Sequence, residues 1–373
     1  MAEAWFGVHP SGPSTVSVDG VDVALASFLG DATTMSFLLK VLAIAAPLSL
    51  QLHPNLEQAA AGFARENRRG VALSDSGRVF RDANHKPELI CALTVIDALC
   101  GFRTRSEALQ FLDVLSGPTT ARLANEVRKG VETRDIIRKL LTATDPLLGV
   151  TTQERLLATN DLGERAGRLA DRADCPESLR LGAEWLVKLA QAYPGDGGVA
   201  VAVFLNCVRV RPGDALYLAA GNMHAYLHGV GIEIMANSDN VVRGGLTPKH
   251  IDVDVLTELV DTEPSTVPLV KAFRSRLAGG ARTEYWPVPV KDFSLLRVAV
   301  SDGETGILTI GNRPSVVLCS SGHVRLRGSR GADSSGIETA CTLTKGQAVY
   351  AAPSQALHVS GYGEVFVAGS GEY

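Results

Sequence analysis

Several features are absent from this sequence, and each absence excludes a class of protein. The six cysteines lie far apart and form no CxxC pair, so neither a disulfide framework nor a thiolate zinc site is predicted. We expect reduced, mostly buried thiols. No dense Lys/Arg block occurs and the formal net charge is −4, which argues against a nucleic-acid partner. A small-molecule partner is therefore expected.

Long uninterrupted apolar runs are also scarce. The most apolar run, from Met35 to Leu52, contains Lys40, Pro47 and Gln51, so we interpret it as buried core and not as a membrane span. The N-terminal stretch "MAEAWFGVHPSG" has no basic segment followed by an apolar one, which argues against a signal peptide. We expect a cytoplasmic protein that does not enter a membrane.

The residues that are present predict a mainly β chain with a helical insert. At 373 residues, with 46% apolar and 20% charged residues, the chain is long enough for two or three packed units. Val-rich and Gly-rich strand patterns fill residues 1–104 and 192–253, where "VAVAVFL" is predicted to resume β structure after the loop "YPGDGG". Helical spacing of apolar residues fills 105–191. Residues 254–373 end in strands such as "SLLRVAVS" and "GHVRLRG", and form the third predicted unit.

A short internal repeat links the first and third units. "PGDALYLAA" from Pro212 and "KGQAVYAAP" from Lys345 match at a shift of 133 residues, with four identical positions. Two copies of one β unit are therefore predicted. At the same shift His224 corresponds to Leu357, so the second copy lacks a residue that we consider as a metal ligand below, and we expect it to be structural.

The stretch "LQLHPN" ends the apolar run with two polar side chains. In a strand, Gln51 and His53 lie two residues apart and share a face, and Pro54 then ends the strand. Such a pair can chelate a metal. The alternative is a core histidine beside a hydrogen-bonded glutamine, and an isolated pair of this kind favours that alternative because buried polar groups usually find partners within the protein.

A second segment, "DANHKPELICALT", places Glu88 at the mouth of an apolar strand. A buried carboxylate is unfavourable unless a cation or a metal pairs with it. A salt bridge to an arginine is the alternative for Glu88. Lys86, two residues earlier, is either part of the same site or an ordinary surface charge.

A third segment, "AAGNMHAYLHG", delivers His224 three residues after Gly221. The glycine and histidine spacing from Gly213 resembles the second cupin motif, with Ala219 where proline is usual, and a loop histidine is the alternative. Gln51, His53, Glu88 and His224 together would offer two nitrogen and two oxygen ligands without a thiolate. Such a set suits zinc or another divalent first-row ion in an open site.

The fourth segment, "EIMANSDNVVRGGLTPKH", carries charged groups suited to a phosphate or an enediolate oxygen. Glu233 and Asp239 are possible acid/base groups, Arg243 precedes a Gly-Gly pair, and Lys249 follows six residues later. A guanidinium and an ammonium so placed would bind phosphate or enediolate oxygens. An ordinary surface loop with a loose ion pair is the alternative.

These segments together resemble the type I phosphomannose isomerases, the zinc-dependent mannose-6-phosphate isomerases. The matching words are "AEAWFGVHPSGPS", "FLLKVLAIAAPLSLQLHPN", "GFARENRRG", "DANHKPELICALT" and "GNMHAYLHGVGIEIMANSDNVVRGGLTPKHIDV". Members usually carry a further N-terminal segment with a Tyr-x-Trp-Gly word, which is not found here. Asn55-Leu56 also stands where many members have a lysine.

The resemblance implies a fold, a cofactor and roles for individual residues. The fold would be two cupin-type (jelly-roll, double-stranded β-helix) barrels plus an α-helical domain, with the metal site in the first barrel. One Zn²⁺ per chain would be held by Gln51, His53, Glu88 and His224. The catalytic residues would be Arg243, Lys86 and Glu233, and the substrate-binding residues Ser49, Lys249 and Asp239.

The expected reaction interconverts mannose 6-phosphate and fructose 6-phosphate through a cis-enediol intermediate. It would feed mannose activation, the route to GDP-mannose, or the use of mannose as a carbon source. We expect a monomer. Two alternatives remain at this point: a non-catalytic sugar-phosphate-binding cupin, and a metal-dependent cupin oxygenase or epimerase. The glutamine at position 51, where such oxygenases usually have histidine, and the cluster from Arg243 to Lys249 speak against the second.

Overall fold

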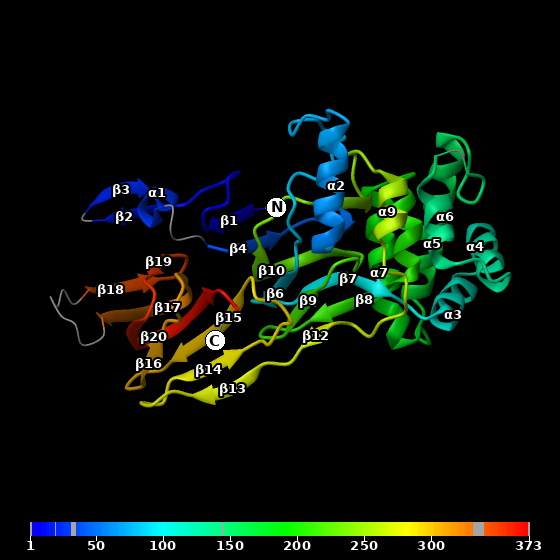
Figure 1. The fold of residues 1–373 in the computed structure, drawn as a ribbon. Helices are drawn as coiled ribbons and strands as arrows, with labels where there is room; N and C mark the ends of the chain where they lie inside the picture. The colour runs from blue at the N-terminus through cyan, green and yellow to red at the C-terminus, as the bar shows by residue number, and fades with distance from the viewer. Residues whose placement is uncertain (1, 19, 31–34, 144, 331–338, 372–373) are drawn as a thin grey trace.

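The strands of this chain form two large antiparallel sheets, and a group of helices covers one end (Figure 1). The computed structural model describes residues 2–18, 20–30, 35–143, 145–330 and 339–371. The two sheets lie side by side along the molecule, and the helices stand at the far end of the first sheet (Figure 1). This arrangement confirms the prediction of a mainly β chain with helices in its middle.

The first sheet contains ten strands and is centred on β10. β10 is long enough to pair with β4 and β6 in its second half and with β5 and β7 in its first half. The ten strands are β1 (Ala2–Phe6), β4 (Phe37–Ile44), β5 (Leu50–Leu52), β6 (Glu88–Ala92), β7 (Ile96–Phe102), β8 (Leu205–Val210), β9 (Ala215–Leu218), β10 (His224–Ala236), β11 (Val242–Gly245) and β12 (Leu269–Val270).

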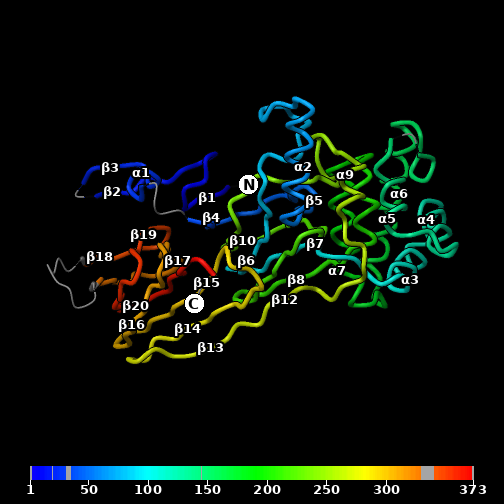
Figure 2. Tube along the Cα trace, viewed as in Figure 1, coloured from blue at the N-terminus to red at the C-terminus, as the bar shows by residue number. Residues whose placement is uncertain are grey.

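The second sheet contains eight strands and is centred on β20 in the same way. These strands are β13 (Phe273–Arg276), β14 (Arg282–Tyr285), β15 (Ser294–Val300), β16 (Thr305–Thr309), β17 (Ser315–Arg330), β18 (Thr339–Thr344), β19 (Ala348–Ala351) and β20 (Gln355–Gly369). A separate hairpin of β2 (Thr15–Val18) and β3 (Val21–Ala24) leads into the short helix α1 (Leu25–Leu29). The tube view shows this hairpin above β17 to β20 (Figure 2).

The helices fall where the apolar spacing predicts them. The middle of the chain forms α3 (Arg105–Leu115), α4 (Pro118–Arg128), α5 (Thr133–Leu141), α6 (Thr152–Ala170) and α7 (Glu177–Ala192). Thr104 and Glu107 form a capping box at the start of α3, which satisfies backbone N–H groups at that end. After β5, Asn55 caps α2 (Leu56–Arg68), and Gly70, with a positive φ of 71°, follows the end of this helix. The last helix is α9 (Val253–Leu259).

The prediction that "VAVAVFL" is a strand is wrong. The segment forms α8 (Gly197–Val201) and the 3₁₀ helix η1 (Ala202–Phe204), and strand structure begins only at β8. Every residue of α8 and η1 is buried, so tertiary packing overrides the β preference of the valines. Asp196 caps α8 through Gly198 N, and a Cβ on Gly198 would lie 2.8 Å from Leu246 N. A helix of small residues therefore packs directly behind the end of β11.

The two sheets share a hydrophobic core. Phe37, Leu39 and Ile232 of the first sheet pack with Leu295 and Phe366 of the second. A further buried cluster lies within each sheet, and another joins the helices to β5, β7 and β8. The apolar run from Met35 onward thus forms β4 and β5 and is part of the buried core, as predicted. Among the described residues, no helix has the length and apolar character needed to cross a membrane.

Candidate metal centre and active site

Three neighbouring strands present polar side chains in one row. Gln51 on β5 pairs with His224 on β10 on one side and with Arg243 on β11 on the other. Directly opposed residues of antiparallel strands project to the same face of the sheet. The amide, the imidazole and the guanidinium are therefore brought together by strand register, although they come from distant parts of the sequence.

Glu88 and His53 complete the group. Glu88 is the first residue of β6, and His53 follows the last residue of β5. Glu88 Oε1 lies 3.3 Å from His53 Nε2, and Glu88 Oε2 lies 3.6 Å from His224 Nε2. All three side chains are buried. Among the described residues no arginine pairs with Glu88; the cation beside this carboxylate is Lys86.

The spacing of these atoms fits a single metal ion. One ligand atom from each of His53, Glu88 and His224 lies within 4.8 Å of the other two. Tetrahedral zinc with bonds of about 2.1 Å requires ligand atoms about 3.4 Å apart, close to the separations observed. Two of the atoms, His53 Nε2 and Glu88 Oε2, are buried and have no hydrogen-bond partner among the described residues. Buried polar atoms without partners are unfavourable, and a bound cation would satisfy both.

Hydrogen bonds to the rear nitrogens fix how the two imidazoles face. His53 Nδ1 lies 2.7 Å from the carbonyl oxygen of Asn240, and His224 Nδ1 lies 3.0 Å from that of Asn222. A carbonyl can only accept, so each Nδ1 carries the proton and each Nε2 presents a lone pair to the group. Burial lowers the pKa of both histidines, that of His224 to about 4. Both rings are therefore neutral at pH 7, as metal ligands must be.

Lys86 lies against the same carboxylate. Its Nζ is 3.0 Å from Glu88 Oε1, and the side chain is buried. Burial raises the pKa of Glu88, but the positive charge of Lys86 outweighs this effect and holds the pKa well below its usual value. The carboxylate is therefore ionised, and a single negative charge faces two neutral imidazoles.

Gln51 reaches the group through its side-chain amide. Gln51 Nε2 lies 3.5 Å from His224 Nε2, and Gln51 Oε1 accepts a hydrogen bond of 3.3 Å from Ser49 Oγ. A half-turn of the amide exchanges oxygen and nitrogen without moving other atoms, and it would point the oxygen at the ligand group. Gln51 is thus close enough to serve as a fourth ligand, with Ser49 directly beside it.

Arg243 and Arg81 add positive charge beside the group. Arg243 is half-buried on β11, and burial together with the charge of Arg81 lowers its pKa without removing its proton at neutral pH. Arg81 donates from its side chain to Leu73 O at 2.9 Å. Two guanidinium groups whose positive charges repel each other favour the binding of an anion between or beside them.

Glu233 points inward and meets a lysine that the sequence reasoning missed. Glu233 on β10 pairs with Lys40 on β4, and Glu233 Oε2 lies 3.5 Å from Lys40 Nζ, with both side chains buried. Burial and the charge of Glu88 raise the pKa of Glu233, although Lys40 opposes the shift. The sequence held one signal for Lys40: a charge inside an otherwise buried strand needs a partner.

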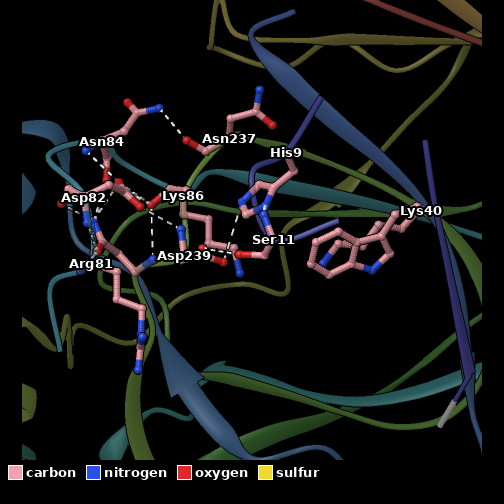
Figure 3. Close-up of polar contacts among 12 residues, drawn as sticks. His9, Ser11, Lys40, Arg81, Asp82, Asn84, Lys86, Asn237 and Asp239 are labelled. Atoms are coloured by element: carbon pink, nitrogen blue, oxygen red, sulfur yellow. Dashed lines mark hydrogen bonds and ion pairs between the residues drawn. The ribbon is translucent and has the colours of Figure 1, made fainter. Parts of the chain in front are cut away.

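The remaining predicted residues lie farther out. Asp239 is partly exposed, accepts a hydrogen bond of 3.0 Å from Ser11 Oγ and lies 3.5 Å from His9 Nε2 (Figure 3). Lys249 is exposed beyond β11, and its backbone N–H donates to Thr247 Oγ1. The structure therefore brings Asp239 into the polar network around the site and leaves Lys249 at the surface.

Other polar residues were also missed by the sequence reasoning. Asp82, Asn84 and Asn240 form a connected network beside Lys86, part of which is seen in Figure 3. His9 is buried although it lies in an N-terminal loop. Asp, Asn and Ser are common in ordinary turns, so the words "RDAN" and "NSDN" gave no sign that they would interlock.

Comparison with known proteins places this arrangement in a family. Residues 1–105 match the model of the phosphomannose isomerase type I catalytic domain. The mannose-6-phosphate isomerase of Salmonella typhimurium is 34% identical over 342 residues, which cover 88% of this chain and 82% of that protein. The enzyme of that name from Schizosaccharomyces pombe is 34% identical over 356 residues, covering 88% and 81%.

Solved structures match this chain over nearly its whole length. The crystal structure of a zinc-bound mannose 6-phosphate isomerase superposes with a TM-score of 0.83 at 29% identity, covering 99% of this chain and 91% of the other. A second crystal structure, with zinc and yttrium, gives a TM-score of 0.82 at 29% identity, with coverage of 99% and 91%. The agreement therefore extends beyond the catalytic-domain match to both sheets and the helices. This chain belongs to the type I phosphomannose isomerase family.

Proposed function

We propose that this chain is a zinc-dependent aldose-ketose isomerase that interconverts mannose 6-phosphate and fructose 6-phosphate. The observation that carries this function is the buried group of His53, Glu88 and His224, with two polar atoms that lack partners among the described residues. It occurs in a chain whose relatives are named mannose-6-phosphate isomerases. We also propose a role in mannose activation or in the use of mannose as a carbon source.

The proposed ligands of one Zn²⁺ are Gln51, His53, Glu88 and His224. Two imidazole nitrogens, one carboxylate and one amide suit zinc in an open site, and one carboxylate leaves the centre with net positive charge. When bound, zinc would polarise a carbonyl or hydroxyl oxygen of the sugar and stabilise negative charge on it. The protein's own part is to hold these four donors in place, through strand pairing and the two Nδ1 hydrogen bonds.

Arg243 is proposed to bind the substrate and stabilise the enediolate. It lies in the same cross-strand row as Gln51 and His224, so its guanidinium projects from the face that carries the ligands. A fixed positive charge aimed at an oxygen that becomes negative lowers the barrier without reorganisation during the reaction. Ser49, Asp239 and Lys249 are proposed to bind other parts of the substrate; Ser49 also supports Gln51.

Lys86 and Glu233 are the two proposed proton carriers. The reaction removes a proton from the carbon beside the carbonyl and returns it to the neighbouring carbon. Glu233 is buried and its pKa is raised, which makes this carboxylate a stronger base, whereas Lys86 lies against the ligand carboxylate. We would replace each by a neutral side chain, Glu233→Gln and Lys86→Met, and follow solvent deuterium into the product. If both variants keep wild-type exchange, the assignment is wrong.

We propose that each large sheet forms a cupin-type barrel and that the helices form a separate domain. The proposed units are 1–104 with 192–253, 105–191, and 254–373. Because α9 contacts α5 and β12 pairs with β9 of the first sheet, the boundary at 254 is better moved to about 271. We also propose a monomer, which the native mass in solution would test.

A combined metal and activity measurement tests the function. Metal analysis of the purified protein should find one zinc per chain, and a coupled assay with mannose 6-phosphate should show turnover. Arg243→Lys keeps the charge but loses the planar fork of donors, so we expect activity about 10²-fold lower with the zinc content unchanged. Bound zinc without turnover in the wild type would favour a sugar-phosphate-binding cupin. Iron in place of zinc would favour an oxygenase or epimerase.

A further inference from the structure

The turn between β10 and β11 joins several parts of the candidate site. Its residues, Asn237 to Asn240, are here called the NSDN turn. Asn237 Nδ2 donates to Met35 O at 2.7 Å, and Ser238 Oγ donates to Asp82 Oδ1 at 2.9 Å. Figure 3 shows Asn237 and Asp239 of this turn facing the loop that carries Asp82, Asn84 and Lys86. The turn is therefore held against two other segments by its own side chains.

Asn240 is the most constrained residue of the turn. It is fully buried, and its Oδ1 accepts hydrogen bonds from the backbone N–H groups of Arg81 at 2.7 Å and Asp82 at 3.3 Å. Its Nδ2 donates to the carbonyl oxygens of Asp82 at 2.9 Å and Asn84 at 2.8 Å. One amide thus spans the backbone of the Arg81–Asn84 segment, using both its donors and its acceptor.

The same residue holds a proposed metal ligand through its backbone. The carbonyl oxygen of Asn240 accepts the hydrogen bond of 2.7 Å from His53 Nδ1. A shift of the Asn240 backbone would move this carbonyl, and with it the hydrogen bond that orients the His53 ring. Partners behind a ligating histidine set its orientation and tautomer, and their loss commonly lowers metal affinity or activity by about 10–100-fold.

The Asp82 side chain also holds the NSDN turn against the Arg81–Asn84 segment. It accepts hydrogen bonds from Asp239 N at 2.8 Å, from Asn84 N at 2.9 Å and from Asn240 Nδ2 at 3.2 Å, besides the one from Ser238 Oγ. The chain continues from Asn84 through Lys86 to Glu88. Fixing residues 82–84 therefore fixes where Lys86 and Glu88 enter the site.

We propose that Asn240 is a positioning residue that holds the His53 imidazole and the Lys86–Glu88 segment in one fixed relation. This inference rests on the proposed zinc site. Through its backbone Asn240 orients one ligand, and through its side chain it places the segment that supplies a second ligand and a proposed proton carrier. Metal affinity and the placement of Lys86 are then set by the same residue, although Asn240 touches neither metal nor substrate.

Two conservative variants test this role. Asn240→Asp keeps the size and the acceptor toward Arg81 N and Asp82 N, but sets a second carboxylate oxygen against Asp82 and Asn84 O. We expect zinc affinity to fall about 10–100-fold, measured by competition with a chromophoric chelator. We expect kcat to fall more than KM rises. Asp82→Asn disturbs the same contact from the other side and should act in the same direction.

The double variant, Asp82→Asn with Asn240→Asp, restores one amide and one carboxylate to the side-chain contact of 3.2 Å, but the carboxylate at position 240 still faces the carbonyl oxygens of Asp82 and Asn84. We therefore expect it to recover part of the lost zinc affinity and not all of it. The visible spectrum of the Co²⁺-loaded protein, which reports ligand geometry, should change in each single variant and return toward wild type in the double variant. A merely structural role would lower stability without changing this spectrum.

Asn237→Ala is the matched control within the same turn. It removes the hydrogen bond to Met35 O but leaves the Asn240 contacts, so we expect lower thermal stability with zinc affinity within about twofold of wild type. Wild-type zinc affinity in Asn240→Asp and Asp82→Asn would overturn the inference. So would an equal loss of affinity in Asn237→Ala. A wild-type chain that binds no zinc would instead overturn the proposed function, and this inference with it.

Discussion

The two large sheets use the same strand pairing but carry opposite chemistry at one end. In the first sheet β5 pairs with the start of β10, and Gln51 lies opposite His224. In the second sheet β16 pairs with the start of β20, and Leu308 lies opposite Leu357. The repeat predicted from the sequence relates His224 to Leu357. Strand pairing independently relates Gln51 to Leu308.

The other two proposed ligands have apolar or small counterparts as well. His53 lies two residues after Gln51, and Ile310 lies two residues after Leu308. Glu88 pairs with Leu218, and Ser315 pairs with Ala351, which is the residue related to Leu218 by the repeat. The side chains of Leu308, Ile310 and Leu357 join the buried cluster within the second sheet.

The difference between the two sheets shows that the polar residues at this end of the first sheet are not needed for the fold. Three buried aliphatic side chains fill this end of the second sheet, so the strand pairing needs no polar residue there for stability. The first sheet instead buries two imidazoles and a carboxylate, with two atoms left without partners among the described residues. Such residues are unfavourable for folding alone, and they point to a function added to a common framework.

The largest expected effect comes from giving the first sheet the residue of the second. His224→Leu removes one proposed ligand, and we expect kcat to fall at least about 10³-fold, because a metal ion contributes several kcal/mol of charge stabilisation. A coupled assay with mannose 6-phosphate measures this. Leu357→Met, a volume-conserving change at the corresponding position, should leave activity unchanged. Full activity in His224→Leu would show that the two ends do not differ in function.

The second-largest expected effect is a loss of stability when zinc is removed. With free zinc at about 1,000 times its dissociation constant, binding to the folded state adds about 4 kcal/mol to the free energy of unfolding. Urea unfolding with and without a chelator measures the difference. The His224→Leu variant should lose most of this dependence on zinc. An equal zinc dependence in wild type and variant would place the metal elsewhere.

Acid should destabilise the metal-free protein through the buried histidines of the first sheet. Burial lowers the pKa of His224 to about 4, against 6.5 in the unfolded chain. Between these values only the unfolded state takes up the proton, so stability falls as pH falls, by about 3 kcal/mol at pH 4, and is unaffected above pH 6.5. Unfolding free energies at pH 7, 6 and 5 should show a shallower slope in His224→Leu. Identical slopes would contradict the neutral, buried imidazole.

The smallest expected effect comes from the reverse exchange. Leu357→His places an imidazole among Leu308, Ile310 and Val359, where apolar side chains offer no partner. We expect a loss of about 2 kcal/mol in the free energy of unfolding, the cost of burying an unpaired polar group. Zinc content should not rise, because one histidine does not make a site. A second bound zinc would show that the second sheet needs only one ligand to become functional.

Polar residues within apolar segments were the ones that sequence reasoning could recognise as site candidates. Gln51 and His53 lie two residues apart at the end of an apolar run, and Glu88 begins another, so each needs a polar or charged partner when it is buried. The middle helices were equally clear from their apolar spacing. The segment "VAVAVFL" was misjudged because β-branched residues suit a strand locally, whereas its burial behind β11 decides for a helix.

Pairing between distant segments was beyond local reasoning. Lys40 was seen only as an interruption in an apolar run, and its partner Glu233 lies far along the chain. Asn240 and Asp82 looked like ordinary turn residues, because the hydrogen bonds that join them cross a large gap in the sequence. Ser49 likewise had a role only by resemblance until its hydroxyl was found beside Gln51.

The sequence by itself determined which side chains are available and which strands and helices present them. Period-two spacing put Gln51 and His53 on one face, and the repeat marked His224 as the residue that Leu357 replaces. Only the tertiary structure decided which of these side chains meet. Strand register aligned His224, Gln51 and Arg243, and the NSDN turn fixed His53, because long-range pairing follows from the packing of the whole chain and not from local preference.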